Sequence, residues 1–316
     1  MPIALRLRPI FPAVRPALAI ALLILSFTAS SAFAQPIPAI RNKISAGDFL
    51  SAESILEVHR QQKGEDSAYL QGLGWLSRGA AITGNWDAAE RYANLAESLA
   101  GKEIEAQGME KANAAVSALG SALEVKAQVL DASGKRAEAV RLLTESIAVW
   151  PQAPIAFRSR LYKRRNMFNL EGQLAPPIPV DEQPGPVFPA LISLKGAPVV
   201  LFFWAEWCGD CRAQSAALAA VYKAFAPRGV RFLSVTRFYK EANEVELARV
   251  KAQWKEHYAD LESVPLAISA EAMERYGVSS TPTFAFVASD GTVRRYTPTR
   301  LTEARLTAEI NSLLRP

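Results

Sequence analysis

Cysteine and histidine are scarce in this sequence, which contains two of each among its 316 residues. A structural zinc site uses four Cys or His ligands, and Cys208 and Cys211 have only His59 and His257 to complete such a set. His59 lies far away along the chain, and His257 stands alone in a predicted helix. The sequence therefore argues against a metal site, and it leaves no further cysteine for a disulfide that only stabilises the fold.

A strong net charge is also missing once the first residues are set aside. The whole chain has 36 basic and 31 acidic side chains. Three of the arginines precede residue 35, so the remainder has 33 basic and 31 acidic side chains and a formal charge of +2. A nucleic-acid-binding protein has a clear basic excess on at least one face. We therefore expect no nucleic-acid partner.

The first 34 residues differ in character from the rest of the chain. Three arginines are their only charged side chains, an apolar run follows over 17–27, and Ala32 and Ala34 offer small residues for cleavage. This order is typical of a secretory signal peptide. The apolar run is shorter than the ~20 residues that span a bilayer, so an uncleaved membrane anchor is the weaker alternative. We interpret residues 1–34 as a signal peptide and expect an exported, periplasmic protein.

Residues 35–172 contain three segments of one form, in which an apolar-periodic helix, a glycine turn and an alanine-rich helix follow one another. In each segment an alanine comes five residues after the glycine, where a small side chain lets two antiparallel helices approach closely. The glycines are Gly47, Gly84 and Gly134, and the alanines are Ala52, Ala89 and Ala139. The form resembles the tetratricopeptide repeat, whose period is about 34 residues. Here the glycines are 37 and 50 residues apart, so the repeat is degenerate. We predict an all-α domain of helical hairpins.

A further helix is predicted over 153–172 and is expected to close the helical stack. It carries the basic run Lys163-Arg164-Arg165. Such a run is typical of a solvated helix face, which is our interpretation, and a docking patch for an acidic partner is the alternative.

Residues 174–186 contain five prolines in thirteen positions. Proline fixes the backbone and removes an amide donor, so this stretch is neither helix nor central strand. We interpret residues 173–186 as a semi-rigid linker between two domains.

Strand and helix patterns alternate over 187–316. A continuous apolar run over 198–205 predicts a strand buried on both faces, and the stretch VRFLSVTRF over 230–238 is interpreted as a second buried strand. Helical patterns follow each run, a hairpin is expected to turn at Asp290-Gly291, and a last helix to begin near Thr302. The expected order, β-α-β-α-β-β-α, predicts an α/β domain with a mixed central sheet.

The two cysteines lie where the first of these strands passes into a helix, in the stretch WAEWCGDCRAQ. Cys208 is expected in the first helical turn, where unpaired N–H groups and the helix dipole favour a thiolate. The thiolate is the form that attacks a disulfide. Gly209 and Asp210 separate the pair, and this spacing lets Cys211 reach Cys208 from one turn deeper. We predict that Cys208 is the exposed nucleophile and Cys211 the resolving thiol. Two incidental buried cysteines are the remaining alternative.

Two stretches, LFFWAEWCGDC and YGVSSTPTFAFVASDGTV, resemble the thioredoxin superfamily, and most closely its exported TlpA-like thiol–disulfide oxidoreductases. The resemblance covers residues from about 186 to 316 and implies a thioredoxin-like fold. It also implies that Pro282 is a cis-proline opposite the cysteines and that the Thr281 backbone pairs with an incoming peptide. We expect at least one of Trp204 and Trp207 to line the groove beside Cys208 in which that peptide packs.

The chain departs from the family at the positions where the family carries acids. Phe202 and Gln214 stand where thioredoxins and TlpA-like reductases carry carboxylates that serve as bases for the resolving thiol. This leaves Asp210 as the first candidate base and Glu206 as the second. We hypothesise that the charge of Asp210 raises the pKa of the Cys208 thiol and that its carboxylate moves protons. Alternatively, Asp210 stays solvated and only complements the helix dipole.

The leading interpretation is an exported thiol–disulfide oxidoreductase, which we expect to reduce disulfides in protein substrates. Its only cofactor is the Cys208–Cys211 pair itself, since no flavin, nicotinamide or metal motif appears, and it requires an external electron-donating thiol protein. The alternative is a binding protein, in which the repeat domain recruits a protein partner and the thioredoxin-like module is a redox-gated clamp.

Overall fold

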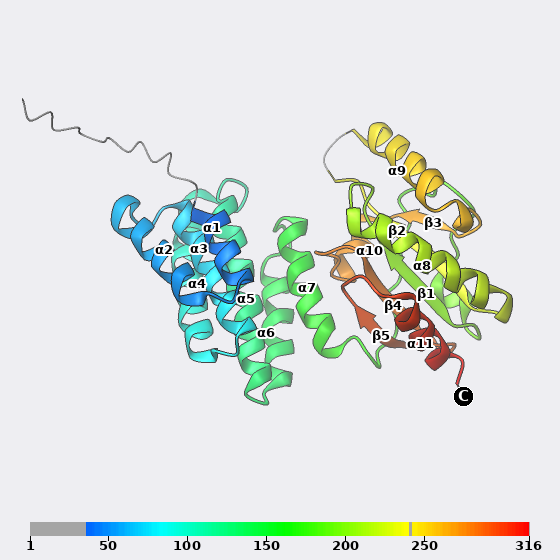
Figure 1. Ribbon diagram of the computed structural model, residues 1–316, viewed down its shortest axis with the longest axis horizontal. Coiled ribbons are helices and arrows are strands. Elements are labelled where there is room, and N and C mark those ends of the chain that lie inside the picture. The colour runs from blue at the N-terminus through cyan, green and yellow to red at the C-terminus, as the bar shows by residue number, and fades with distance from the viewer. Residues whose placement is uncertain (1–35, 240–241, 316) are drawn as a thin grey trace, which may run out of the picture. The chain divides into compact units, whose positions relative to one another are not determined.

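We describe a computed structural model of the chain, which covers residues 36–239 and 242–315 (Figure 1). The predicted signal peptide lies outside these described residues. Residues 35–316 form one compact unit. Within the described ranges, no helix is both long and apolar enough to cross a membrane.

Seven helices make up the described part of the chain before the sheet. They are α1 (Pro36–Ser45), α2 (Phe49–Lys63), α3 (Ser67–Ile82), α4 (Trp86–Gln107), α5 (Asn113–Ala132), α6 (Arg136–Val149) and α7 (Ile155–Asn169). Asp48, Asp66 and Asn85 begin α2, α3 and α4 by accepting hydrogen bonds from backbone amides of the first turn.

The three glycines singled out in the sequence lie in the turns α1–α2, α3–α4 and α5–α6. Their φ angles are +75°, +75° and +78°, a region that glycine adopts without a steric penalty. The alanines five residues on, Ala52, Ala89 and Ala139, are fully buried. This part is a packed helical region, and its assignment to the tetratricopeptide repeats stays a prediction.

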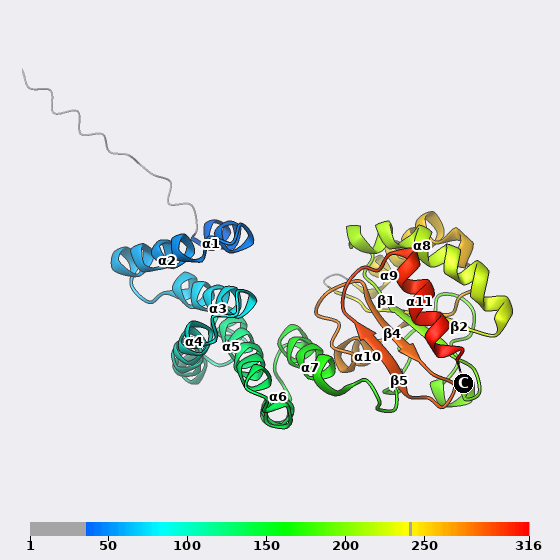
Figure 2. The same cartoon turned by 60° about the horizontal axis from the view of Figure 1, so that its bottom comes forward.

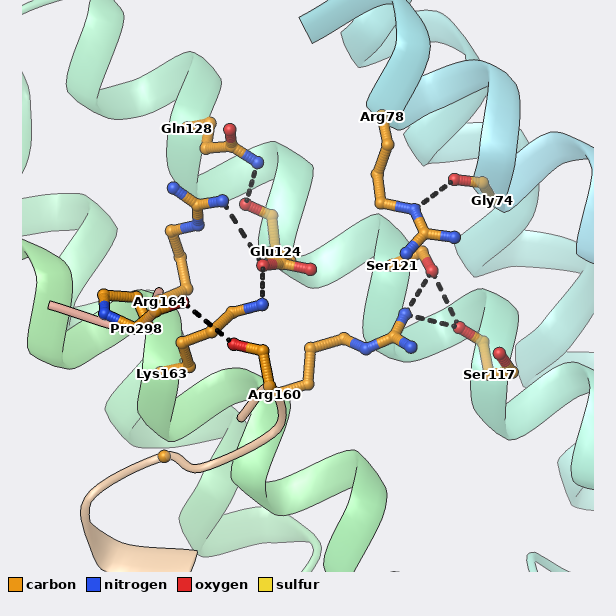
Figure 3. A network of polar contacts seen from close by, with 12 residues as sticks. Gly74, Arg78, Ser117, Ser121, Glu124, Gln128, Arg160, Lys163, Arg164 and Pro298 are labelled. Carbon is orange, nitrogen blue, oxygen red and sulfur yellow. Dashed lines mark hydrogen bonds and ion pairs between the residues drawn. The ribbon is translucent and has the colours of Figure 1, made fainter. Parts of the chain in front are cut away.

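The interpretation of Lys163-Arg164-Arg165 as a solvated face is wrong. In α7, the Lys163 and Arg164 side chains are only 20% and 17% exposed, and both point at the buried carboxylate of Glu124 in α5 (Figure 3). The Arg165 guanidinium lies over the ring of Tyr162, 4.6 Å from its centroid. The run is half-buried because α7 packs against helices on one side and against the sheet region on the other, which its sequence alone does not reveal.

A five-stranded mixed sheet follows, with the strand order β3-β2-β1-β4-β5. The strands are β1 (Val199–Phe203), β2 (Arg231–Thr236), β3 (Leu266–Ile268), β4 (Thr283–Val287) and β5 (Val293–Thr297). β1 pairs in parallel with β2 and antiparallel with β4, β2 pairs in parallel with β3, and β4 pairs antiparallel with β5. Strand β1 is therefore central, and its five residues are all buried.

The helices of this region are α8 (Gly209–Phe225), α9 (Asn243–His257), α10 (Ala270–Arg275) and α11 (Glu303–Leu313), with short 3-10 turns at 191–194, 226–228 and 259–261. Two elements were missing from the expected order: strand β3 and helix α10. They have three and six residues, too few for a hydrophobic period to be recognised, and β3 is defined by its pairing with β2.

The sheet separates two apolar clusters. One contains side chains of α8, α9 and α11 against Phe202, Phe284 and Phe286. The other contains Tyr276 and residues of α10 against Leu201 and Phe203. Helices α8 and α11 pack side by side (Figures 1 and 2). The alternation of side chains along β1 thus divides the core between the two faces.

The proline-rich stretch lies along the sheet. Leu174 forms an isolated bridge with Thr292, and Glu182 forms one with Ile268 of β3. Ile178 is buried in the second cluster. The stretch therefore contacts both edges of the sheet, which covers backbone groups that edge strands otherwise leave unpaired.

Candidate active site

The two cysteines lie just after the central strand. β1 ends at Phe203, and Cys208 is the N-cap residue of α8. Cys208 and Cys211 form a disulfide, with their Cα atoms 5.2 Å apart. The buried apolar strand fixes the start of the helix, and the helix turn brings the two side chains together.

The Cys208 sulfur has two backbone neighbours. It accepts a hydrogen bond from the Cys211 amide at 3.1 Å and lies 3.5 Å from the carbonyl oxygen of Thr281. The Thr281–Pro282 peptide bond is cis, as expected from the resemblance. An amide that points at the sulfur from the helix N-terminus stabilises negative charge there, so this position favours a thiolate when the pair is reduced.

Exposure differs among the residues around the pair. Cys208 is only 5% exposed, so the prediction that it is exposed is wrong; Cys211 is fully buried, whereas Trp207 is 57% exposed. The Trp207 ring packs edge-on against Tyr239 at a centroid distance of 5.4 Å. Trp207 thus offers an apolar surface beside the less buried of the two sulfurs.

The structure explains what Phe202 and Gln214 do in place of the family's acids. Phe202 packs between Tyr258 and Phe284, with ring centroids 5.8 and 5.2 Å away. The fully buried Gln214 donates to the Leu301 carbonyl at 2.9 Å and accepts from the Leu301 amide at 2.8 Å. A carboxylate cannot make both bonds, so Gln214 ties α8 to the segment before α11.

Tyr258 is a site neighbour that the sequence interpretation missed. Its hydroxyl donates a hydrogen bond to the Cys211 carbonyl at 2.6 Å. Burial raises the pKa of this hydroxyl well above its usual value, so Tyr258 stays protonated and acts as a donor. Nothing in its local sequence distinguishes it from other core aromatics.

The two candidate bases lie in different surroundings. The Asp210 side chain is 72% exposed, with Arg300 3.8 Å away. The Glu206 side chain is only 9% exposed and has Arg249 at 3.2 Å from one carboxylate oxygen. Its other oxygen, Oε2, is buried and has no hydrogen-bond partner among the described residues. A buried charge is screened less by solvent than an exposed one, so the charge of Glu206 is screened less than that of Asp210.

This difference predicts an order of effects on thiol reactivity. In the reduced protein, Glu206→Gln is expected to raise the rate of Cys208 alkylation by iodoacetamide at pH 6 about tenfold, because removing a poorly screened negative charge favours the thiolate. Asp210→Asn is the matched control and is expected to raise the rate less than about threefold. A larger increase in the alkylation rate for Asp210→Asn than for Glu206→Gln would show instead that Asp210 controls the ionisation of the Cys208 thiol.

Across the described ranges, no group of three or more His, Cys, Asp or Glu side chains is arranged to hold a metal ion. His59 lies instead 2.8 Å from Asp66, and His257 lies 3.7 Å from Glu256.

The chain matches the AhpC/TSA family over residues 173–296. The thiol-disulfide oxidoreductase ResA of Oceanobacillus iheyensis is 28% identical over 123 residues, which are 39% of this chain and 60% of that protein. The soluble secreted antigen MPT53 of Mycobacterium bovis is 31% identical over 100 residues, which are 32% of this chain and 53% of that protein. The chain thus covers less than two thirds of the length of these relatives.

Solved structures also resemble this part of the chain. One is a thiol:disulfide interchange protein of the thioredoxin family from Chlorobium tepidum, with a TM-score of 0.38 and 21% identity, covering 46% of this chain and 99% of that one.

The sheet order, the helix that begins at the CxxC pair and the family match together define the C-terminal part of the chain as a thioredoxin-like domain of the AhpC/TSA type. This domain is homologous to the ResA-like thiol–disulfide oxidoreductases and carries the Cys208–Cys211 pair. The helical region before it is not covered by the match.

Proposed function

We propose that this protein reduces disulfides in protein substrates outside the cytoplasm, by dithiol–disulfide exchange at Cys208 and Cys211. The observation that carries the proposal is the position of Cys208, which caps α8, bonds to Cys211 and faces Thr281 next to a cis-proline. Export is supported by the sequence of residues 1–34 and by a relative described as a soluble secreted antigen.

The exchange begins with the reduced pair. The Cys208 thiolate attacks one sulfur of the substrate disulfide, a Cys208–substrate disulfide forms, and the second substrate sulfur leaves and takes up a proton. The Cys211 thiolate then attacks the Cys208 sulfur, the Cys208–Cys211 bond forms, and the first substrate sulfur leaves as a thiol. Two electrons and two protons thus pass to the substrate. An external dithiol protein must return them before the next cycle.

Each residue of the site has a proposed part in this exchange. The Cys211 amide stabilises the Cys208 thiolate, and the complete burial of Cys211 keeps the resolving sulfur away from other oxidants. The Thr281 backbone binds the incoming chain as an added strand beside Pro282. Gly209 separates the two cysteines, and an added Cβ there would meet only the end of the Arg212 side chain, 3.8 Å away.

We further propose that the helical region is a tetratricopeptide-like module that recruits a protein partner. Support comes from the equivalent glycine turns and from the fully buried alanines at the same offset in each hairpin. A domain division at residues 173–186 belongs to the same proposal.

Insulin reduction tests the enzymatic function. With dithiothreitol as electron donor, the full chain is expected to accelerate insulin precipitation, and Cys208→Ser is expected to be no faster than dithiothreitol alone. Equal activity of the wild type and the variant would reject the function and favour a binding protein whose partners do not depend on the cysteines.

A further inference from the structure

A cleft lies beside the cysteines, between α7 and the thioredoxin-like domain. It has a volume of about 360 Å³. Its wall on one side includes Trp207 and Thr281, and on the other Arg160 and Lys163 of α7. Trp207 precedes Cys208 in the chain, and the Thr281 carbonyl is 3.5 Å from the Cys208 sulfur. A chain bound at Cys208 therefore has this cleft as its neighbour.

The interface that forms the cleft is closely packed. Arg158 of α7 forms an ion pair with Glu274 at 2.8 Å, and the Asn166 amide donates to the Arg275 carbonyl at 3.0 Å. At Gly277, a Cβ atom would lie 2.4 Å from the Cα of Lys163, so the two backbones are in direct contact. These contacts hold α7 at a fixed distance from the site.

Positive charge dominates the cleft walls. Among the residues that the structure describes, Glu124 is the one acid that lines the cleft, and the cations that line it are Arg78, Arg160, Lys163 and Arg237. Figure 3 shows Lys163 and Arg164 directed at the Glu124 carboxylate, with Arg78 and Arg160 on its other side. Arg160 donates to the Ser121 hydroxyl at 2.6 Å and Arg78 to the Gly74 carbonyl at 3.1 Å, so neither has a carboxylate partner there.

Burial makes this charge excess costly. Burial, and after it the charge of Arg160, lower the pKa of Arg78 to about 10. Burial raises the pKa of Glu124, but the cations around it, Lys163 first, outweigh that effect, so its pKa lies below the usual value. Glu124 is thus ionised, and its single negative charge does not neutralise the several positive charges around it. Half-buried cations without a carboxylate partner are unfavourable, and an anion in the cleft would offset their charge.

We propose that this cleft binds acidic side chains that flank the substrate cysteine, so that the enzyme selects disulfides in acidic peptide segments. The proposal rests on the proposed function, because it deepens the substrate class of the same site. A peptide is the occupant because the cleft continues from Trp207 and Thr281, where the substrate chain must lie during exchange. A volume of this size accepts a short peptide stretch, and guanidinium groups bind carboxylates with paired hydrogen bonds.

The test compares two disulfide-linked peptides whose cysteines are flanked either by glutamates or by glutamines. With the full chain and dithiothreitol, the acidic peptide is expected to have a kcat/KM about tenfold higher at low salt, and the difference is expected to shrink at high salt. In Arg160→Gln/Arg237→Gln the ratio of the two kcat/KM values is expected to fall to about twofold. This pair leaves Lys163 and Arg164 in place around Glu124.

The matched control is Arg141→Gln/Arg165→Gln, which removes the same charge from residues that do not line the cleft and should retain the preference. Equal rates for both peptides in the wild type would overturn the inference and leave the proposed function intact. Absence of turnover with either peptide would overturn the proposed function itself. Loss of the preference in the control pair would also overturn the inference, since net charge rather than the cleft would then be responsible.

Discussion

Cys211→Ser is expected to stop the exchange halfway and leave the substrate covalently bound to Cys208. The reason is geometric: Cys208 caps α8 and can still attack, but the fully buried Cys211 that would release the substrate is gone. A well-oriented intramolecular group acts at an effective concentration far above that of any dissolved thiol, so turnover is expected to fall about a thousandfold or more. Mass spectrometry of the adduct measures the result and identifies the trapped partner.

The double variant Cys208→Ser/Cys211→Ser is the control and should form no adduct. Adducts on Cys211 in a Cys208→Ser protein, at the level seen for Cys211→Ser, would contradict the assignment of the nucleophile.

Gly277→Ala is expected to have the largest effect on stability. Gly277 has a φ of +65°, and an added Cβ would lie 2.4 Å from the Cα of Lys163 and 2.7 Å from the carbonyl carbon of Tyr162. Left-handed strain costs about 1–2 kcal/mol, and the clash with a backbone that cannot rotate away adds about 1–3 kcal/mol. In urea unfolding, the sum of these two costs should appear as a lower midpoint urea concentration than that of the wild type.

Gly229→Ala separates the two contributions. Gly229 has a φ of +90°, but an added Cβ there meets nothing within 4 Å. It should therefore cost only the strain, about 1–2 kcal/mol. If both variants lose the same stability, α7 is not in contact with the thioredoxin-like domain in solution, and the basic cleft is not formed as described.

The cysteine motif and the order of most elements could be predicted because their signals are local. A continuous apolar run predicts β1, and the two cysteines directly after it predict a reactive pair at a helix start. The cis bond at Pro282 was predicted from the family resemblance, because no local pattern of residues in the sequence indicates it. The glycine turns of the helical region were equally local, since each needs only a few residues to form.

Features that depend on distant contacts could not be predicted. The sequence around Lys163 and Arg164 is typical of a solvated helix face. Their ion-pair partner Glu124 lies some forty residues earlier, so the local pattern does not reveal it. From the sequence, Gln214 is only a position where the family's acid is missing. Its function in the fold follows from its two hydrogen bonds to the Leu301 backbone, which lies far along the chain. Strand β3 is too short to carry a pattern, and its pairing with β2 makes it a strand. In each case the decisive partner lies far away in the sequence.

The most direct test of the account is a single turnover without any added thiol. The fully reduced protein is mixed with oxidised insulin, and both products are quantified by alkylation and mass spectrometry. We expect one insulin disulfide to be reduced for each Cys208–Cys211 disulfide that forms, because the pair is the only electron source in the mixture. Insulin thiols that appear while the pair stays reduced, or a pair that oxidises without producing them, would contradict it.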